Sequence, residues 1–304
     1  TLDPGLVADI TASPYADQLF AGLVEITPDL DVVPALAARW EVMEGGSRYV
    51  FHLRPEAQWS DGAPLTAADF VYAWLRVLDP ATVSPCAGLL YDIRGARAHH
   101  EGAARPEAVG VKASDAQTLW VELEAPAGDF LYRLGLPPFF PVPRQAIAVH
   151  GQAWAQPGRI VTCGPFLLET WVPGVSMVLV RNPNYVGSAA GNVERVELSL
   201  GDRSGSLAQY EAGQLDIMAL NHLPLGEWER ARQRHAGEYV AGPVLLTWFV
   251  SFNLTRPPFC DPRVRRAFAL AADREALADV ALKGSHFPAT GGFVPPGMPG
   301  HTPG

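Results

Sequence analysis

The side chains in this sequence that are capable of chemistry do not have the spacing of a catalytic or metal site. Cys86, Cys163 and Cys260 lie far apart, without the C-x-x-C or Cys/His spacing that zinc sites use. The adjacent His99 and His100 would point to different faces of a helix, which favours a solvated surface over joint metal binding. We therefore expect no metal and no cofactor, and whether two of the cysteines meet in space stays open.

Acidic side chains and known catalytic motifs give no support to an enzyme either. The sequence contains no G-x-S-x-G and no H-E-x-x-H. Asp61, Asp129 and Asp216 stand in turn or strand contexts, where carboxylates have ordinary structural uses. We therefore expect a protein without catalytic activity.

The bulk composition is that of a folded globular protein. With 304 residues, 48% of them hydrophobic and 18% charged, the chain can bury one large core or two smaller ones. Acidic residues outnumber Lys and Arg by 32 to 23, so a nucleic-acid partner is not expected. The sequence has no apolar run of the roughly 18–20 residues that cross a bilayer. The sequence contains no segment of the export-signal type, so we expect that any such signal lies outside it.

A β-hairpin is the element around which the other predictions are arranged. Apolar runs at 164–172 and 176–180 flank Pro173 and Gly174, a pair that is typical of a tight turn between antiparallel strands. Pro183 follows the second run, and a proline ends a strand because it has no N–H to donate to the sheet.

Before this hairpin, the pattern predicts a small α+β unit at 41–160. Its strand at 49–53 leads to a helix that Thr66 caps, with Asp69 three residues later as a variant of the capping box. Within this unit a second hairpin is expected at 108–113 and 118–124, with helices at 93–101, 129–136 and 145–150. A helix at 13–22 capped by Ser13 is expected before it.

After the hairpin, strands and helices alternate. Strands are expected at 193–200, 215–220 and 245–252, with helices at 204–213, at 225–233 and from about 263 onward. This alternation predicts an α/β layer rather than a β-sandwich.

Several separated stretches resemble one known family. The hairpin reads GPF, then WVPG, then RNPNY, and the chain also carries LDP, FAGLV, PALAARWEV, WSDGAPLTAADFVYAW, YEAGQLDI, FNLTRPPFCDPRVRRAFALAADREAL and PATGGFVPPG. In type and order these stretches resemble the family 5 extracytoplasmic solute-binding proteins, the oligopeptide and dipeptide receptors of ABC importers. Because the landmarks cover the whole chain, the resemblance is more specific than any single motif.

The resemblance implies a class II periplasmic-binding fold of the α/β class, with two lobes that close on a ligand and an inserted α+β subdomain. On that map, residues 1–40 and 161–250 form the first lobe and 41–160 the inserted subdomain. Residues 251–304 would begin the second lobe. Members of the family continue well beyond this point, so the second lobe is expected to be largely missing from this sequence.

The resemblance also implies a site in which an extended peptide is held by main-chain hydrogen bonds, while roomy pockets accept its varied side chains. The residues that match the wall of the first lobe are Ala8, Asp9, Ile10, Thr162, Cys163, Gly164, Asn221, His222, Val244, Trp248 and Phe249. Trp248 and Phe249 are neighbours on an expected strand, so only one of them can face the ligand and the other should pack in the core.

Two positions depart from the family pattern. Ala8 stands where oligopeptide receptors often place a carboxylate for the peptide amino terminus, and only then comes Asp9, which is also typical of a solvated turn. Cys86 stands after Ser84 and Pro85, where an aromatic residue is common. Gly164 has two interpretations: its missing Cβ lets another backbone approach closely, or it is a plain glycine at the start of a strand.

The sequence therefore predicts a monomeric, extracytoplasmic binding protein that captures oligopeptides and delivers them to the membrane subunits of an ABC permease. A second hypothesis is a sensory or regulatory module, in which a solute-binding half is fused to a signalling protein. Within the class of binding proteins the ligand stays open, because relatives take dipeptides, nickel complexes, opines or oligosaccharides.

Overall fold

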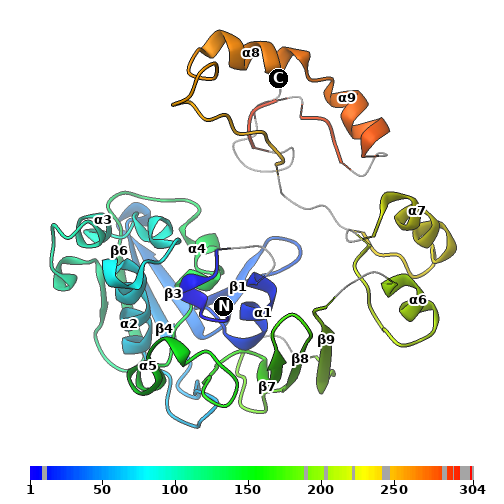
Figure 1. The fold of residues 1–304 in the computed structure, drawn as a ribbon. Coiled ribbons are helices and arrows are strands. Elements are labelled where there is room, and N and C mark those ends of the chain that lie inside the picture. The colour runs from blue at the N-terminus through cyan, green and yellow to red at the C-terminus, as the bar shows by residue number, and fades with distance from the viewer. Residues whose placement is uncertain are drawn as a thin grey trace. The chain divides into compact units, whose positions relative to one another are not determined.

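The computed structural model describes residues 1–8, 12–187, 191–201, 205–220, 223–241, 247–282, 286–289, 291–294 and 302. The chain divides into two compact units, Thr1–Ser204 and Gly205–Gly304, which we call the N-terminal and C-terminal regions (Figure 1).

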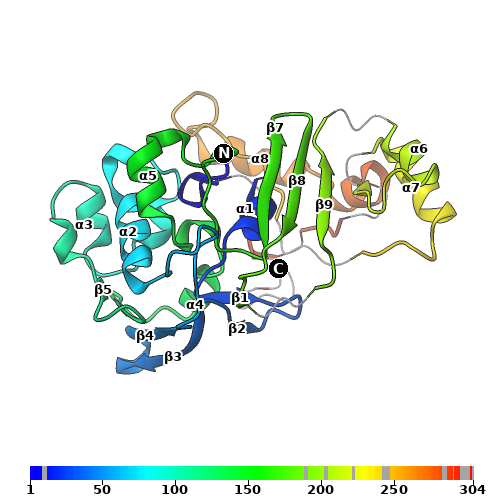
Figure 2. The same ribbon diagram turned by 90° about the horizontal axis from the view of Figure 1, so that it is seen from below.

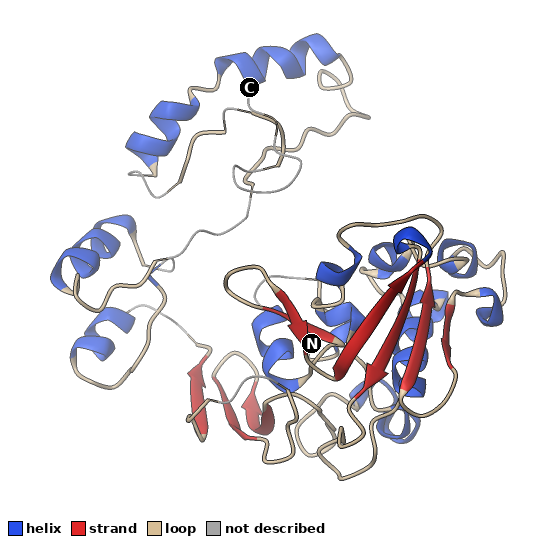
Figure 3. Ribbon diagram, turned by 180° about the vertical axis from the view of Figure 1, so that it is seen from behind, coloured by secondary structure: helices blue, strands red, loops and turns tan. Residues whose placement is uncertain are grey.

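A four-stranded antiparallel sheet is the largest element of the N-terminal region (Figure 3). Its strands are β3 (Ala37–Met43), β4 (Arg48–Leu53), β5 (Val111–Ala113) and β6 (Thr118–Glu122), in the order β3-β4-β6-β5. The predicted strand at 49–53 and the predicted second hairpin are thereby confirmed. Tyr49, Val50, Phe51 and Leu53 on β4 are all buried, as expected for a strand in the middle of the sheet.

Helix α2 (Ala67–Leu78) packs against β5 and β6 of this sheet. It begins as predicted, because the Thr66 N–H donates to Asp69 Oδ2 at 2.7 Å and so closes one half of the capping box. Phe70 and Trp74 are buried, and the Trp74 indole N–H donates to the Phe139 carbonyl at 2.8 Å. A buried tryptophan is thereby fully satisfied.

The short elements around α2 complete the N-terminal region. They are α1 (Ser13–Leu19), α3 (Ala96–His100), α4 (Phe130–Arg133), α5 (Arg144–His150) and the two-stranded pair β1 (Val24–Ile26) with β2 (Val32–Pro34). Several boundaries differ from the prediction, among them those of α1 and α4. Ser13 is the first helical residue of α1 and not its cap, α1 ends at Leu19 before Gly22, and α4 covers only part of 129–136.

The predicted central hairpin is confirmed as β7 (Phe166–Val172) and β8 (Ser176–Arg181), and β9 (Arg195–Ser199) adds a third antiparallel strand. Figure 2 shows the three strands side by side, and α1 packs against β7. Gly174 lies in the turn with a φ of 73°, a conformation that glycine adopts without strain. Met177 and Leu179 on β8 are buried and join one continuous hydrophobic core that also includes Leu2 and Trp74.

The C-terminal region is helical. It contains α6 (Ser206–Glu211), α7 (Leu225–Arg234), α8 (Pro262–Ala271), the short α9 (Arg274–Ala276) and a π-helical turn at Leu277–Ala281. The long helix expected from about residue 263 is therefore interrupted, because α8 ends at Ala271 and Asp273 caps a new helical turn.

Two predicted strands are wrong. Residues 215–220 and the described part of 245–252, which begins at Thr247, have no strand conformation. A helix satisfies its backbone internally, but a strand needs a neighbour to bond with, and these segments pair with none of the described residues. Ile217, an apolar residue in the first of these segments, is 88% exposed.

None of the helices in the described part of the chain has both the length and the apolar character that crossing a lipid bilayer requires.

Candidate ligand-binding wall

The N-terminal segment that leads to the candidate wall is anchored by one buried carboxylate. Asp3 accepts hydrogen bonds from both terminal nitrogens of Arg76, at 3.1 and 2.6 Å, and from the Trp154 indole at 3.1 Å. It also accepts the Gly5 N–H at 3.0 Å, which starts a short 3₁₀ turn at Pro4–Leu6. A buried charge with this many donors is fully compensated, so it fixes the chain where the LDP motif stands.

Two further side chains hold the residues that follow. The Ser84 hydroxyl donates to the Gly5 carbonyl at 2.6 Å, and the Cys86 thiol donates to the Val7 carbonyl at 3.3 Å. Val7 is buried, whereas the next residue, Ala8, is exposed. Ala8 is therefore the first candidate wall residue, and it emerges directly from an anchored segment.

Gly164 is buried against the end of α1. A Cβ at this position would lie 2.5 Å from the Leu19 carbonyl carbon and from the Phe20 nitrogen, so only glycine fits here. Of the two interpretations open from the sequence, close approach of another backbone is the one that the geometry satisfies. The approaching backbone belongs to this chain.

Cys163 is buried beside it, and the main-chain donors of both residues are already engaged. The N–H groups of Cys163 and Gly164 donate to the Leu19 carbonyl at 3.2 and 2.8 Å, and the Asn182 amide donates to the Gly164 carbonyl at 2.8 Å. Burial raises the pKa of the Cys163 thiol to about 12, so this thiol stays protonated and is a poor nucleophile. Contact of these two residues with a ligand stays a prediction, and their observed role is to join β7 to α1.

Trp248 and Phe249 lie in the C-terminal region, and the expectation that one of them packs in the core is wrong. Trp248 is 74% exposed and Phe249 is 64% exposed. Their rings meet other exposed groups: Trp248 lies edge-on to His286 at 6.2 Å, and Phe249 lies edge-on to Phe293 at 5.1 Å. The alternation argument fails here because Thr247 to Phe252 do not form a strand.

Five of the predicted wall residues lie outside the described residues. They are Asp9, Ile10, Asn221, His222 and Val244.

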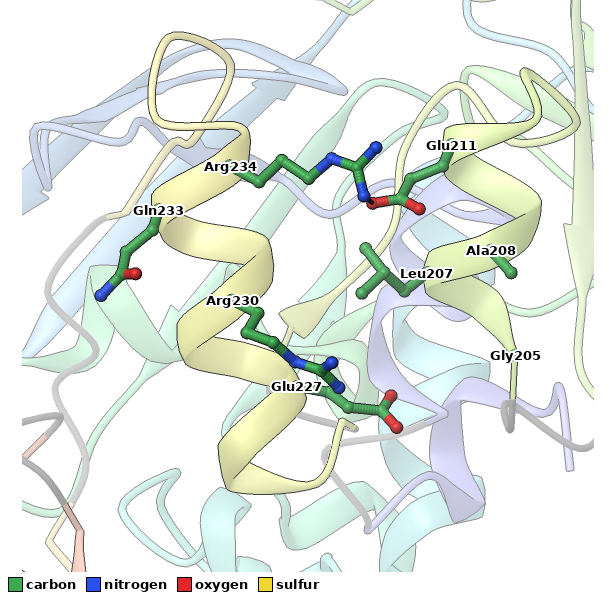
Figure 4. Close-up of a pocket in the computed structure, with 8 residues that line it drawn as sticks. All are labelled: Gly205, Leu207, Ala208, Glu211, Glu227, Arg230, Gln233 and Arg234. Carbon is green, nitrogen blue, oxygen red and sulfur yellow. Dashed lines mark ion pairs between the residues drawn. The ribbon is translucent and has the colours of Figure 1, made fainter.

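A hollow of about 660 Å³ lies in the C-terminal region between α6 and α7, and sequence analysis did not point to it (Figure 4). Arg234 reaches across from α7 to Glu211 on α6 and pairs with it at 2.9 Å. Glu227 and Arg230 also line it, so two acids face two arginines and the lining has no net charge to select an ion.

The described residues contain no group of His, Cys, Asp and Glu side chains arranged to hold a metal. His99 and His100 each contact a backbone carbonyl, of Ala104 at 3.1 Å and of Leu78 at 2.9 Å. All three cysteines are free, with Cys86 and Cys163 buried and Cys260 exposed, so the open question of pairing is answered.

Sequence analysis did not point to the contacts made by Asp3, Arg76, Ser84 and Cys86. Their contacts join residues 73 to 151 positions apart in the sequence, and no local pattern reports such pairs.

The profile of bacterial extracellular solute-binding proteins, family 5 (middle), matches residues 31–304. The chain belongs to this family. It is 41% identical over 303 residues to the probable deoxycholate-binding periplasmic protein YgiS of Escherichia coli, which covers 99% of this chain. It is 36% identical over 299 residues to the periplasmic oligopeptide-binding protein OppA of E. coli, which covers 97% of it.

Solved structures of family members share the fold. The murein tripeptide binding protein MppA of E. coli superposes on 100% of this chain with a TM-score of 0.92 and 32% identity. The predicted fold class, α/β of the periplasmic-binding type, is thereby confirmed. The chain spans 56% of the length of YgiS, 54% of OppA and 59% of MppA.

Proposed function

We propose that the protein containing this chain captures peptides outside the cytoplasm and delivers them to the membrane subunits of an ABC importer. The observation that carries the proposal is the family match over residues 31–304. The names of OppA and MppA, an oligopeptide-binding and a murein tripeptide binding protein, support peptides as the ligand class. A receptor of this kind needs no reactive side chain, so we also propose that it does not catalyse a reaction. We further propose that it is monomeric.

The proposed architecture follows the lobes expected from the sequence. Residues 1–40 and 161–250 would belong to the first lobe, 41–160 to an inserted subdomain, and 251–304 to the start of the second lobe. Every peptide offers the same backbone donors and acceptors, so a wall that bonds to main-chain groups suits ligands of varied sequence. Trp248 and Phe249, whose rings are exposed, would supply apolar contact area for ligand side chains.

A second candidate ligand is a steroid acid. It is favoured by the 41% identity to YgiS, which exceeds the 36% identity to OppA. Such a ligand has a broad apolar face and one carboxylate, so exposed aromatic rings would suit it as well as they suit peptide side chains. The two candidates differ in the contacts they need, because a steroid has no peptide backbone that could form main-chain hydrogen bonds with the wall.

Ligand identification on the native, full-length gene product tests the proposal. We expect mass spectrometry of the purified protein to find co-purified peptides, and calorimetry to show binding of mixed tri- to pentapeptides. Binding of deoxycholate with no binding of peptides would overturn the peptide assignment in favour of the second candidate. A gene that encodes a signalling domain on the same chain would instead support the sensory module.

Residues 1–304 by themselves are expected to bind peptides weakly or not at all. One wall supplies only part of the hydrogen bonding and cannot exclude water from the ligand. Calorimetry with the same peptides checks this, and micromolar or tighter affinity of residues 1–304 would contradict the two-walled account.

A further inference from the structure

The loop at Ser84 to Cys86 touches the N-terminal segment at two regularly spaced points. The Ser84 hydroxyl bonds to the carbonyl of Gly5 at 2.6 Å, and the Cys86 thiol bonds to the carbonyl of Val7 at 3.3 Å. Both pairs advance by two residues in the same direction, as the rungs of a parallel ladder do. Here the donors are side chains, so the loop fixes two alternate carbonyls of the segment, those of Gly5 and Val7.

The far side of the same segment is fixed as well. Asp3 is held by Arg76 and Trp154, and a Cβ on Gly5 would lie 3.0 Å from the Val77 side chain of α2. The segment from Asp3 to Val7 is therefore held by contacts on two sides, and the main chain reaches the surface at Ala8. Any small movement of the loop would be passed to Ala8 through one peptide unit.

The loop itself is held in an uncommon conformation. Val83, directly before Ser84, has a φ of 53° and a ψ of 41°, in the left-handed region that β-branched residues avoid. Its side chain is 78% exposed, so the side chain does not account for the conformation. Val83 ends the 3₁₀ turn at Pro80–Thr82, and its N–H donates to the Pro80 carbonyl at 3.3 Å, while the bonds from Ser84 and Cys86 hold the residues that follow.

We propose that Ser84 and Cys86 are positioning residues that set the main chain of the candidate wall at Ala8. This inference rests on the proposed function, in which that wall meets the ligand. Recognition through main-chain bonds requires backbone atoms to be held within about 0.5 Å of their bonding positions. Cys86, which stands where the family commonly has an aromatic residue, thereby holds the Val7 carbonyl next to the wall.

Amide hydrogen exchange on residues 1–304 tests the holding contacts. Ser84→Ala and Cys86→Ala should each raise the exchange rate at Leu6 and Val7 about two- to tenfold, the range that one neutral hydrogen bond contributes to a local opening. Cys86→Ser keeps a donor and should recover most of the protection. Ser47→Ala is the matched control, because Ser47 makes the same kind of bond to the Glu44 carbonyl at an exposed site.

Unchanged exchange at Leu6 and Val7 in both alanine variants would overturn the inference. A uniform rise that includes the β4 and β6 amides would do so as well, because it would report a loss of global stability instead of a local release.

Ligand affinity in the native, full-length gene product separates positioning from mere anchoring. The peptide that co-purifies with the protein is the probe, and Ser84→Ala should weaken its binding about three- to tenfold. The melting temperatures of Ser84→Ala and Ser47→Ala are compared to check that both variants remain folded. If wild type binds no peptide, the proposed function fails while the exchange result still decides the contacts. If exchange rises but affinity is unchanged, Ser84 does not position the wall and the inference is wrong.

Discussion

The two regions of the molecule treat their apolar side chains differently. In the N-terminal region Phe20, Phe51, Phe70 and Trp74 are at most 1% exposed and belong to one continuous core. In the C-terminal region the buried hydrophobic residues among those described are Ala231 and Ala278, while larger side chains such as Leu270 and Phe287 are 79% and 92% exposed. The first region therefore has its own hydrophobic stabilisation, and the second has very little.

The same contrast separates the two kinds of secondary structure. Helices form in both regions, because their hydrogen bonds lie within one segment. Strands β1 to β9 all lie in the N-terminal region, where each finds a neighbour. Residues 215–220 and 247–252 have strand-like sequences but no paired strand among the described residues, so the pattern alone did not produce a strand. Local propensity thus suffices for a helix, whereas a strand depends on what lies beside it.

The largest effect is expected from separating the regions. Residues 1–204 should fold alone and unfold in one cooperative transition, because they contain the core. Residues 205–304 should show helical signal without a cooperative transition, since helices without tertiary packing are marginal. Circular dichroism during thermal unfolding measures both fragments. A cooperative transition in the second fragment would break the comparison.

A single Cβ in the core of the N-terminal region should have the next largest effect. Gly164→Ala would place an atom 2.5 Å from the backbone of Leu19 and Phe20, so β7 and α1 must separate. We expect a loss of about 3 kcal/mol in the free energy of unfolding by urea. Gly128→Ala is the control, because nothing lies within 4 Å of its Cβ position. It should leave stability unchanged or raise it by up to about 1 kcal/mol.

Removing the charge of Asp3 should follow. Asp3→Asn leaves the Arg76 guanidinium without its buried counter-charge, and we expect a loss of about 3 kcal/mol in the free energy of unfolding. Asp129→Asn breaks an exposed pair with Arg133, whose Nε lies 2.8 Å from the carboxylate, and should cost about 1 kcal/mol or less. Equal losses of stability in the two variants would show that the buried Asp3 network contributes no more to stability than an exposed ion pair does.

The smallest effect is a gain. Val83→Asn keeps the left-handed backbone but places there a residue that tolerates it, so the free energy of unfolding should rise by about 0.5–1 kcal/mol. Val149→Asn is matched in exposure, at 75% against 78%, but lies in the helix α5 and should gain nothing. A loss of stability in Val83→Asn would mean that the valine side chain makes a contact of its own.

The sequence predicted elements that depend on local patterns and failed for elements that depend on distant neighbours. The Pro173–Gly174 turn and the capping box at Thr66 are local patterns, and each produced the expected element. The strands at 215–220 and 245–252 depended on neighbours that no local pattern specifies. The family was predicted from the order of its motifs. The hydrogen bonds from Ser84 and Cys86 to the carbonyls of Gly5 and Val7 join residues 79 positions apart, and no local pattern indicated them. For Asp9, Ile10, Asn221, His222 and Val244 the assignment to the wall stays a prediction.

Native-state hydrogen exchange of residues 1–304, followed through low concentrations of denaturant, tests the contrast between the regions most directly. The account predicts that the amides of Phe51 and Leu119, in the centre of the four-stranded sheet, exchange only through global unfolding. It predicts that the amides of α8 exchange orders of magnitude faster and independently of denaturant. Amides of α8 that share the protection and the denaturant dependence of Phe51 would contradict it, because the two regions would then unfold as one.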